Sequence, residues 1–168
     1  MIRYDALIVA ITQLAEAPEY RLGHFDSVFI SVWYSRLNIP ALETLERFHR
    51  ELAAKYGKVT FLSIVVGAAE NPPADVRARM QEGTKELLPL RRANLIVVQT
   101  RGLSAIIARS FLAAMSLMSS EKMGVFKTVE EAVAEAQRLP DQDASVKANT
   151  RLAYEVKAFV DLPAPASK

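Results

Sequence analysis

The sequence contains no cysteine and only two histidines among its 168 residues. Without cysteine the chain has no disulfide, no thiolate nucleophile and no cysteine ligand for a metal. The two isolated histidines, His24 and His49, do not make a metal-binding cluster. We therefore expect no metal and no other cofactor. The lack of cysteine is also compatible with a cytoplasmic location, which we expect for this protein.

The chain also lacks an excess of charge of one sign, because its 21 basic and 19 acidic residues are mixed along its length. No basic stripe with interleaved aromatic residues is present, which argues against a nucleic-acid partner. No run approaches the about 20 apolar residues that a membrane span requires. The apolar segment 1–18 is interrupted by Thr12 and Gln13, and it carries Asp5 where a signal peptide is basic. We interpret it as a short amphipathic helix.

The composition, with 51% hydrophobic residues, is that of one globular domain. A β-hairpin is predicted after Pro18, with the strands "EYRL" and "VFISVWYS" around the turn "GHFDS". Strands and helices then alternate. The expected elements are a helix over 38–57, a strand over 59–67, a helix over 70–90, a strand over 93–100, a helix over 103–120, a strand over 123–128, and helices over 128–139 and 144–160.

This alternation predicts an α/β fold with a mixed, mostly parallel sheet of about four to five strands and helices packed against it. We expect residues 1–18 to be a helical extension, 19–140 the α/β domain, and 141–168 a further helix with a loose tail. The segment "LAYEVKAFV", 152–160, is also compatible with a strand. The helix over 38–57 is the clearest, since acids and bases four residues apart are expected to pair along its polar face: Glu43 with Arg47, Glu46 with Arg50, and Glu51 with Lys55.

Residues 20–139 resemble the SpoIIAA-like branch of the STAS family, the anti-sigma-factor antagonists. The features that carry the resemblance are the hairpin "YRLGHFDSVFISVWYS", the helix after "NIP", the stretch "FLSIVVGAAENPPADVRARM" and the ending "VFKTVEEAVAEAQRL". The resemblance implies a STAS-like fold and a bacterial-type signalling regulator that works by being bound by a partner.

Many STAS domains are switched by phosphorylation of a Ser or Thr at the start of the helix after the central strand. The corresponding stretch here, "GAAENPPAD" (67–75), has no hydroxyl residue, so that control does not carry over. The resemblance suggests this loop, with Glu70, Asn71 and Asp75, as a contact surface. Glu70 or Asp75 either supplies a permanent negative charge at the helix start or is an ordinary first-turn acid.

No residue constellation indicates catalysis. His24, Asp26 and Ser27 lie within four residues in a turn, where Asp and Ser are favoured for their backbone hydrogen bonds. A catalytic triad requires its members to converge around an oxyanion site. We therefore predict no catalytic residue.

The segment "QTRGLSA", 99–105, is a candidate anion-binding turn. A strand ends there and a helix begins, so free backbone N–H groups beside Arg101, Gly102 and Ser104 can hold an anion. The signal is weak, because every strand-to-helix turn of this architecture offers the same groups and no Gly-rich phosphate loop is present.

The helix expected over 103–120, "LSAIIARSFLAAMSLMSS", is apolar on nearly all sides, and such a helix is buried on all sides. One face packs on the sheet. The N-terminal helix, the C-terminal helix or another molecule covers the other face, which includes Leu112 and Met115. If another molecule covers it, these two residues bind a protein partner or a second copy in a homodimer.

The sequence thus favours a non-enzymatic regulatory or scaffolding module that acts through protein–protein contacts. The alternative is a binder of a small apolar or lipid-like ligand, with a closed cavity beneath the N-terminal segment.

Overall fold

A computed structural model of the chain describes residues 10–67, 71–99, 101–102, 106, 109 and 123–166. Its centre is a six-stranded sheet whose strand order follows the sequence, β1-β2-β3-β4-β5-β6. The first three strands are antiparallel neighbours and β3 to β6 are parallel. The strands are β1 (Thr12–Ala17), β2 (Tyr20–Phe25), β3 (Val28–Trp33), β4 (Val59–Val65), β5 (Arg91–Val98) and β6 (Met123–Phe126). The predicted α/β class with a mostly parallel sheet is confirmed.

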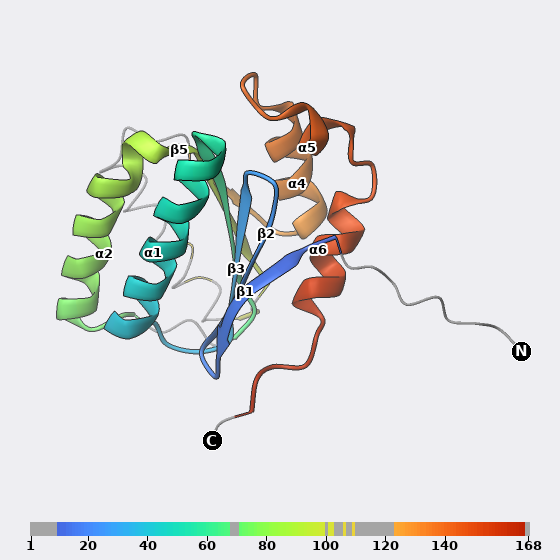
Figure 1. Ribbon diagram of the computed structural model, residues 1–168. Helices are drawn as coiled ribbons and strands as arrows, with labels where there is room; N and C mark the ends of the chain where they lie inside the picture. Colours follow the sequence, from blue (N-terminus) through green and yellow to red (C-terminus); the bar gives the residue numbers. More distant parts are fainter. Residues whose placement is uncertain are drawn as a thin grey trace, which may run out of the picture.

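The described helices form two layers, one on each face of the sheet (Figure 1). They are α1 (Ile39–Tyr56), α2 (Ala74–Leu87), the 3₁₀ turn η1 (Leu88–Leu90), α4 (Val129–Arg138), α5 (Ala144–Ala148) and α6 (Leu152–Val160). Helices α1 and α2 lie side by side on one face, and α4, α5 and α6 lie on the other. Because side chains alternate along a strand, each face has its own core. On β3, Phe29 faces α1, whereas Val28 and Ile30 face the α4–α6 layer.

The N-terminal helical extension predicted for 1–18 is wrong for its second half, since Thr12–Ala17 is strand β1. This strand pairs antiparallel with β2, and the turn at Pro18–Glu19 places Ala17 opposite Tyr20. Leu14, Ala15 and Ala17 pack against the core on the α1 side. Pairing with an existing strand therefore outweighs the weak helix preference of this segment. Residues 1–9 lie outside the described part.

The hairpin between β2 and β3 is tighter than "GHFDS" suggests. Gly23, His24 and Phe25 belong to β2, and the turn is at Asp26, whose φ is 45°. An Asp tolerates this left-handed backbone better than most residues.

The single helix expected over 144–160 is two helices, α5 and α6, separated at Asn149–Arg151. The Gln137 side chain of α4 explains the break, because its amide donates to the carbonyls of Val146 (3.0 Å) and Asn149 (2.8 Å). The alternative of a strand over 152–160 is wrong. Phe159 of α6 packs against Gly23 so closely that a Cβ there would lie 2.7 Å from the Phe159 ring.

The apolar segment 103–120 lies outside the described residues except for Ile106 and Arg109, which are both exposed. Leu112 and Met115 are not among those described, so their role in contacts stays a prediction. Within the described ranges, no helix is long and apolar enough to cross a membrane.

Candidate functional site

The structure does not bring His24, Asp26 and Ser27 together as a catalytic group. The His24 Nδ1 atom lies 3.0 Å from the backbone oxygen of Asp26. Ser27 is fully buried, and its hydroxyl donates to the Asp143 carboxylate and to Gln142 Oε1 (3.3 Å). All three residues are used for turn geometry and packing, as their types in a turn suggest.

Ser27 belongs to a buried polar network centred on Arg92 of β5. The Arg92 side chain is 5% exposed and pairs with Asp141 (3.4 Å) and Asp143 (3.6 Å). Its Nη1 donates to Gln142 Oε1 (2.9 Å) and to Ser27 Oγ (3.2 Å). The network joins the start of β5 to the loop between α4 and α5. It lies at the amino ends of the parallel strands, whereas open α/β sheets bind ligands at the carboxyl ends, so we assign it a structural role.

A register shift in the sheet places Arg92 in this network. Val59 pairs with Arg91 but Thr60 pairs with Ala93, so Arg92 is an extra residue in β5. Such a bulge locally breaks the alternation of side chains. Arg91 lies over the Phe61 ring on the α1 side, while Arg92 contacts Thr60 and Gln142 on the other. Sequence reasoning missed both buried arginines, because a pair of arginines at a strand start gives no signal of burial.

A third buried arginine, Arg21 of β2, holds the end of α6. It is 4% exposed and donates to the carbonyls of Phe159 (3.5 Å), Leu162 (3.2 Å) and Pro163 (2.5 Å). The Phe159 carbonyl is one that a helix leaves unpaired at its C-terminus, where a positive charge is also favourable, and Leu162 and Pro163 follow the helix end directly. Arg21 donates to the Tyr34 hydroxyl as well (2.7 Å). Burial raises the pKa of Tyr34, although the Arg21 charge acts in the opposite direction.

His49 of α1 is fully buried between the α1 layer and the sheet. Its ring meets Phe29 and Phe61 edge-on, with centroids 5.6 and 5.7 Å away, and neither ring nitrogen has a hydrogen-bond partner. Burial, followed by the positive charges of Arg91 and Arg50, lowers the pKa of His49 to about 3. A neutral imidazole enclosed by aromatic rings has no access to substrate or metal, so His49 is part of the core.

The carboxyl edge of the sheet holds the described part of the candidate anion site. Gly102 has a φ of 70°, and its carbonyl accepts from the Ile106 N–H (3.3 Å), the four-residue spacing of an α-helical hydrogen bond. Arg101 is exposed beside it, and Ser104 lies outside the described residues. Because the described strands follow sequence order, they provide no reversal of strand order, the place where open α/β sheets form their ligand crevice. Anion binding here stays a prediction.

The loop suggested as a contact surface is described only in part. Asn71 and Asp75 are exposed, whereas Glu70 is not among the described residues. Asp75 lies in the first turn of α2, whose N-cap residue, Pro73, makes no side-chain hydrogen bond. This position is favourable for an acid near the positive end of the helix dipole, and both interpretations of Asp75 remain open.

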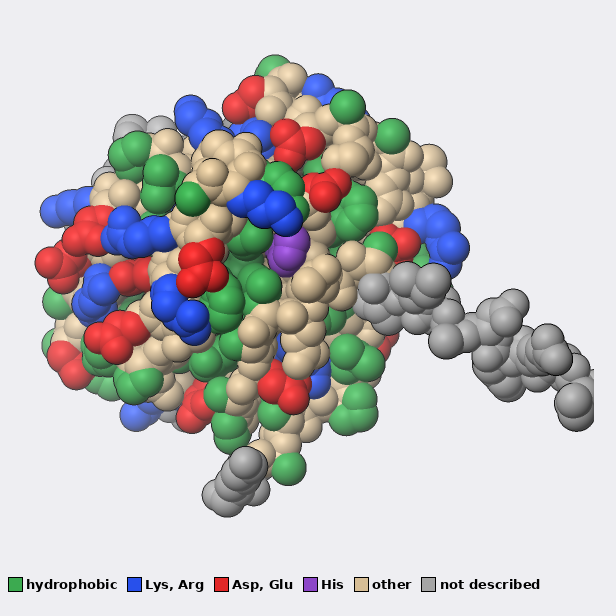
Figure 2. Space-filling view, in the orientation of Figure 1, with side chains coloured by type: hydrophobic (Ala, Val, Ile, Leu, Met, Phe, Trp, Pro, Cys, Tyr) green, Lys and Arg blue, Asp and Glu red, His purple; other side chains and the backbone are tan. Residues whose placement is uncertain are grey.

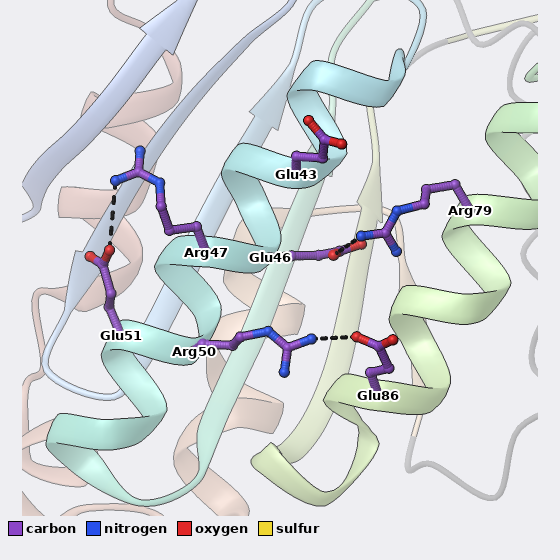
Figure 3. A pocket seen from close by; sticks show the side chains of 7 residues that line it. All are labelled: Glu43, Glu46, Arg47, Arg50, Glu51, Arg79 and Glu86. Atoms are coloured by element: carbon purple, nitrogen blue, oxygen red, sulfur yellow. Dashed lines mark hydrogen bonds and ion pairs between the residues drawn. The ribbon is translucent and has the colours of Figure 1, made fainter.

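A shallow, open groove of about 450 Å³ runs between α1 and α2 on the outer surface (Figure 3). Figure 2 shows acidic and basic side chains interspersed over this side of the molecule. Arg47 and Glu51 pair at 3.6 Å along α1. The groove is lined by Glu43, Glu46, Arg47, Arg50, Glu51, Arg79 and Glu86.

Two ion pairs cross the groove and tie α1 to α2. Arg50 binds Glu86 at 2.5 Å, and Glu46 binds Arg79. Glu46 and Arg50, which the sequence predicts to pair with each other, instead each pair with a residue of α2. Their spacing along α1 gives no sign of these partners. Gly83 of α2 makes room for Glu46, because a Cβ at Gly83 would collide with the Glu46 carboxylate.

Within the described residues, no group of three or more His, Asp or Glu side chains is placed to hold a metal ion. No family model, curated protein or solved structure matches the chain. The resemblance to the STAS family therefore remains a prediction from the sequence pattern.

Proposed function

We propose that this protein is a regulatory or scaffolding module that acts through protein–protein contacts and not by catalysis. The observation that carries the proposal is the open groove between α1 and α2, where Arg47, Arg50 and Glu51 of α1 and Glu86 of α2 are exposed above the buried Glu46. Alternating charges on two helices joined by ion pairs suit the polar, steered recognition of another protein surface.

The proposal that the protein does not act by catalysis is supported by polar side chains of its described interior, several of which are engaged in contacts with one another or with the backbone. Ser27, Arg92 and Gln142 bind one another, and Arg21 binds the end of α6. General acid–base catalysis requires a side chain that can reach a substrate proton, with a pKa near the working pH. His49 cannot reach a substrate, because aromatic rings enclose it, and its pKa of about 3 lies far from neutral pH.

A photo-cross-linking experiment tests the proposal. A photoreactive amino acid replaces Glu82, which is exposed on α2 beside the groove, or, as the control, Arg138, which is exposed on α4 in the opposite layer. Irradiation in extract of the native cell is expected to give a discrete cross-linked species from position 82 and none from position 138.

The matched variant exchanges the charges of one ion pair, Arg50→Glu with Glu86→Arg. It keeps the pair between α1 and α2 but reverses its direction, so the melting temperature is expected to stay unchanged while the cross-link is lost. Equal labelling at both positions, no labelling at position 82, or a cross-link that survives the exchange would contradict the proposal.

A further inference from the structure

The outward face of α1 carries charges of alternating sign at regular spacing. Glu43, Arg47, Glu51 and Lys55 follow one another at intervals of four residues, and all are exposed. Residues four apart lie on the same side of a helix, so these side chains form one slowly turning row. In Figure 3, Arg47 and Glu51 point away from α2, in contrast to Arg50, which reaches across to Glu86.

We propose that this row binds the same row of a second copy of the chain, with the two α1 helices antiparallel about a two-fold axis. The inference goes beyond the proposed function, since it adds a contact with a second copy of the chain on the side of α1 where Arg47 and Glu51 point away from α2. In a two-fold contact, residue i meets residue j and residue j meets residue i. With the axis passing beside position 49, Glu43 meets Lys55 and Arg47 meets Glu51. All four contacts across the axis then join opposite charges.

Other registers of the same antiparallel helices make fewer contacts between opposite charges, and some bring like charges together. An axis beside Arg47 places the two copies of Arg47 together and sets Glu43 against Glu51. An axis beside Glu51 places the two copies of Glu51 together and sets Arg47 against Lys55. An axis beside position 45 or 53 retains only two opposite-charge contacts. Among the antiparallel arrangements of two copies, charge complementarity therefore favours the register with its axis beside position 49.

The side chains between the charges allow the helices to approach. Thr44 and the exposed, small Ala54 face each other in this register. Phe48 is half-buried and covered by the Arg47 guanidinium, 4.3 Å from its ring centroid. These residues add apolar contact beside the row of ion pairs without a large exposed hydrophobic patch.

The association is expected to be weak and dependent on salt. Exposed ion pairs contribute little each, and salt screens them over about 10 Å at 0.1 M. We therefore expect a dimer that dissociates when the salt concentration is raised from about 20 mM to about 500 mM.

Charge-reversal variants test the register directly by sedimentation or light scattering at low salt. In a homodimer, Glu43→Lys sets two lysines against each other twice, and Lys55→Glu sets two glutamates against each other twice. Each variant alone is expected to associate at least about tenfold more weakly than the original chain, since one change removes two attractive contacts. Mixing the two variants restores both contacts, so a heterodimer is expected to form with the original affinity.

The control is Arg138→Glu, which makes the same charge change as reversing a base of the row but lies on α4, in the opposite layer, and is expected to leave association unchanged. A chain that stays monomeric at low salt, unaffected dimers in both single variants, or no recovery on mixing would overturn the proposal. A cross-link from position 82 to a different protein would persist in that case, so the failure of the α1 contact is distinguishable from failure of the proposed function.

Discussion

Replacing His49 is expected to remove a specific part of the acid sensitivity of the fold. Neutral His49 is buried without hydrogen bonds, and its pKa falls from 6.5 to about 3 in the folded state. Between these pH values the unfolded chain binds a proton at this site and the folded chain does not. The free energy of unfolding therefore decreases as the pH falls from 6.5 towards 3.

The magnitude follows from the difference in pKa. Each pKa unit corresponds to about 1.4 kcal/mol, so His49 lowers the stability by about 3 kcal/mol at pH 4.5 and by roughly 5 kcal/mol below pH 3. The His49→Gln variant keeps a neutral polar side chain but does not titrate. The His49→Leu variant also removes the two unpaired nitrogens, which is expected to add about 1–3 kcal/mol of stability at pH 7.

Urea denaturation followed by the fluorescence of Trp33, the chain's one tryptophan, measures these effects at pH 7 and pH 4.5. The carboxylates titrate alike in the original chain and both variants. Their contribution therefore cancels when the decrease in unfolding free energy between pH 7 and pH 4.5 is compared among the three proteins. The original chain is expected to lose about 3 kcal/mol more than either variant over this interval. Equal losses in the original chain and both variants would refute the reasoning, because they would show that His49 titrates alike in the folded and unfolded states.

Three further substitutions probe the packing. Gly83→Ala is expected to bring none of the about 1 kcal/mol that Ala normally contributes to a helix, because its Cβ displaces the Glu46 carboxylate; a variant stabilised by that full amount in thermal unfolding would contradict the close contact of α1 and α2. Gly23→Ala is expected to cost about 1–3 kcal/mol, and combining it with Phe159→Leu should recover part of the loss; strictly additive costs in the double-mutant cycle would speak against that contact. Arg92→Met leaves buried polar partners unpaired and is expected to cost about 3–5 kcal/mol in urea denaturation, whereas a loss below 1 kcal/mol would show that the network contributes little.

Local sequence determined the elements whose signals lie within a few residues. Helix α1 begins where Asn38 caps it, with the side chain accepting from the Ala41 N–H, and it ends before Gly57, whose φ is 83°. Helix α4 begins after Thr128, whose hydroxyl accepts from the Glu131 N–H. In a capping box the Glu131 carboxylate would accept from the N–H of Thr128; here it accepts from the N–H of Lys127, one residue earlier.

Tertiary structure decided the features that depend on distant partners. Thr12–Ala17 contains residues common in helices and becomes β1 because β2 offers it a strand to pair with. Glu46 and Arg50 have suitable partners within α1, yet they pair with α2 because Gly83 brings the two helices close together.

The buried arginines show the limit of sequence reasoning most clearly. Arginine is rarely buried unless partners satisfy its charge and its five N–H donors. For Arg21 those partners are carbonyls at the end of α6, and for Arg92 they lie in the loop after α4, far along the chain in both cases. Hydrophobic periodicity and caps are local and can be read from the sequence. The burial of a charge depends on which groups the fold brings to it, and only the folded chain shows that.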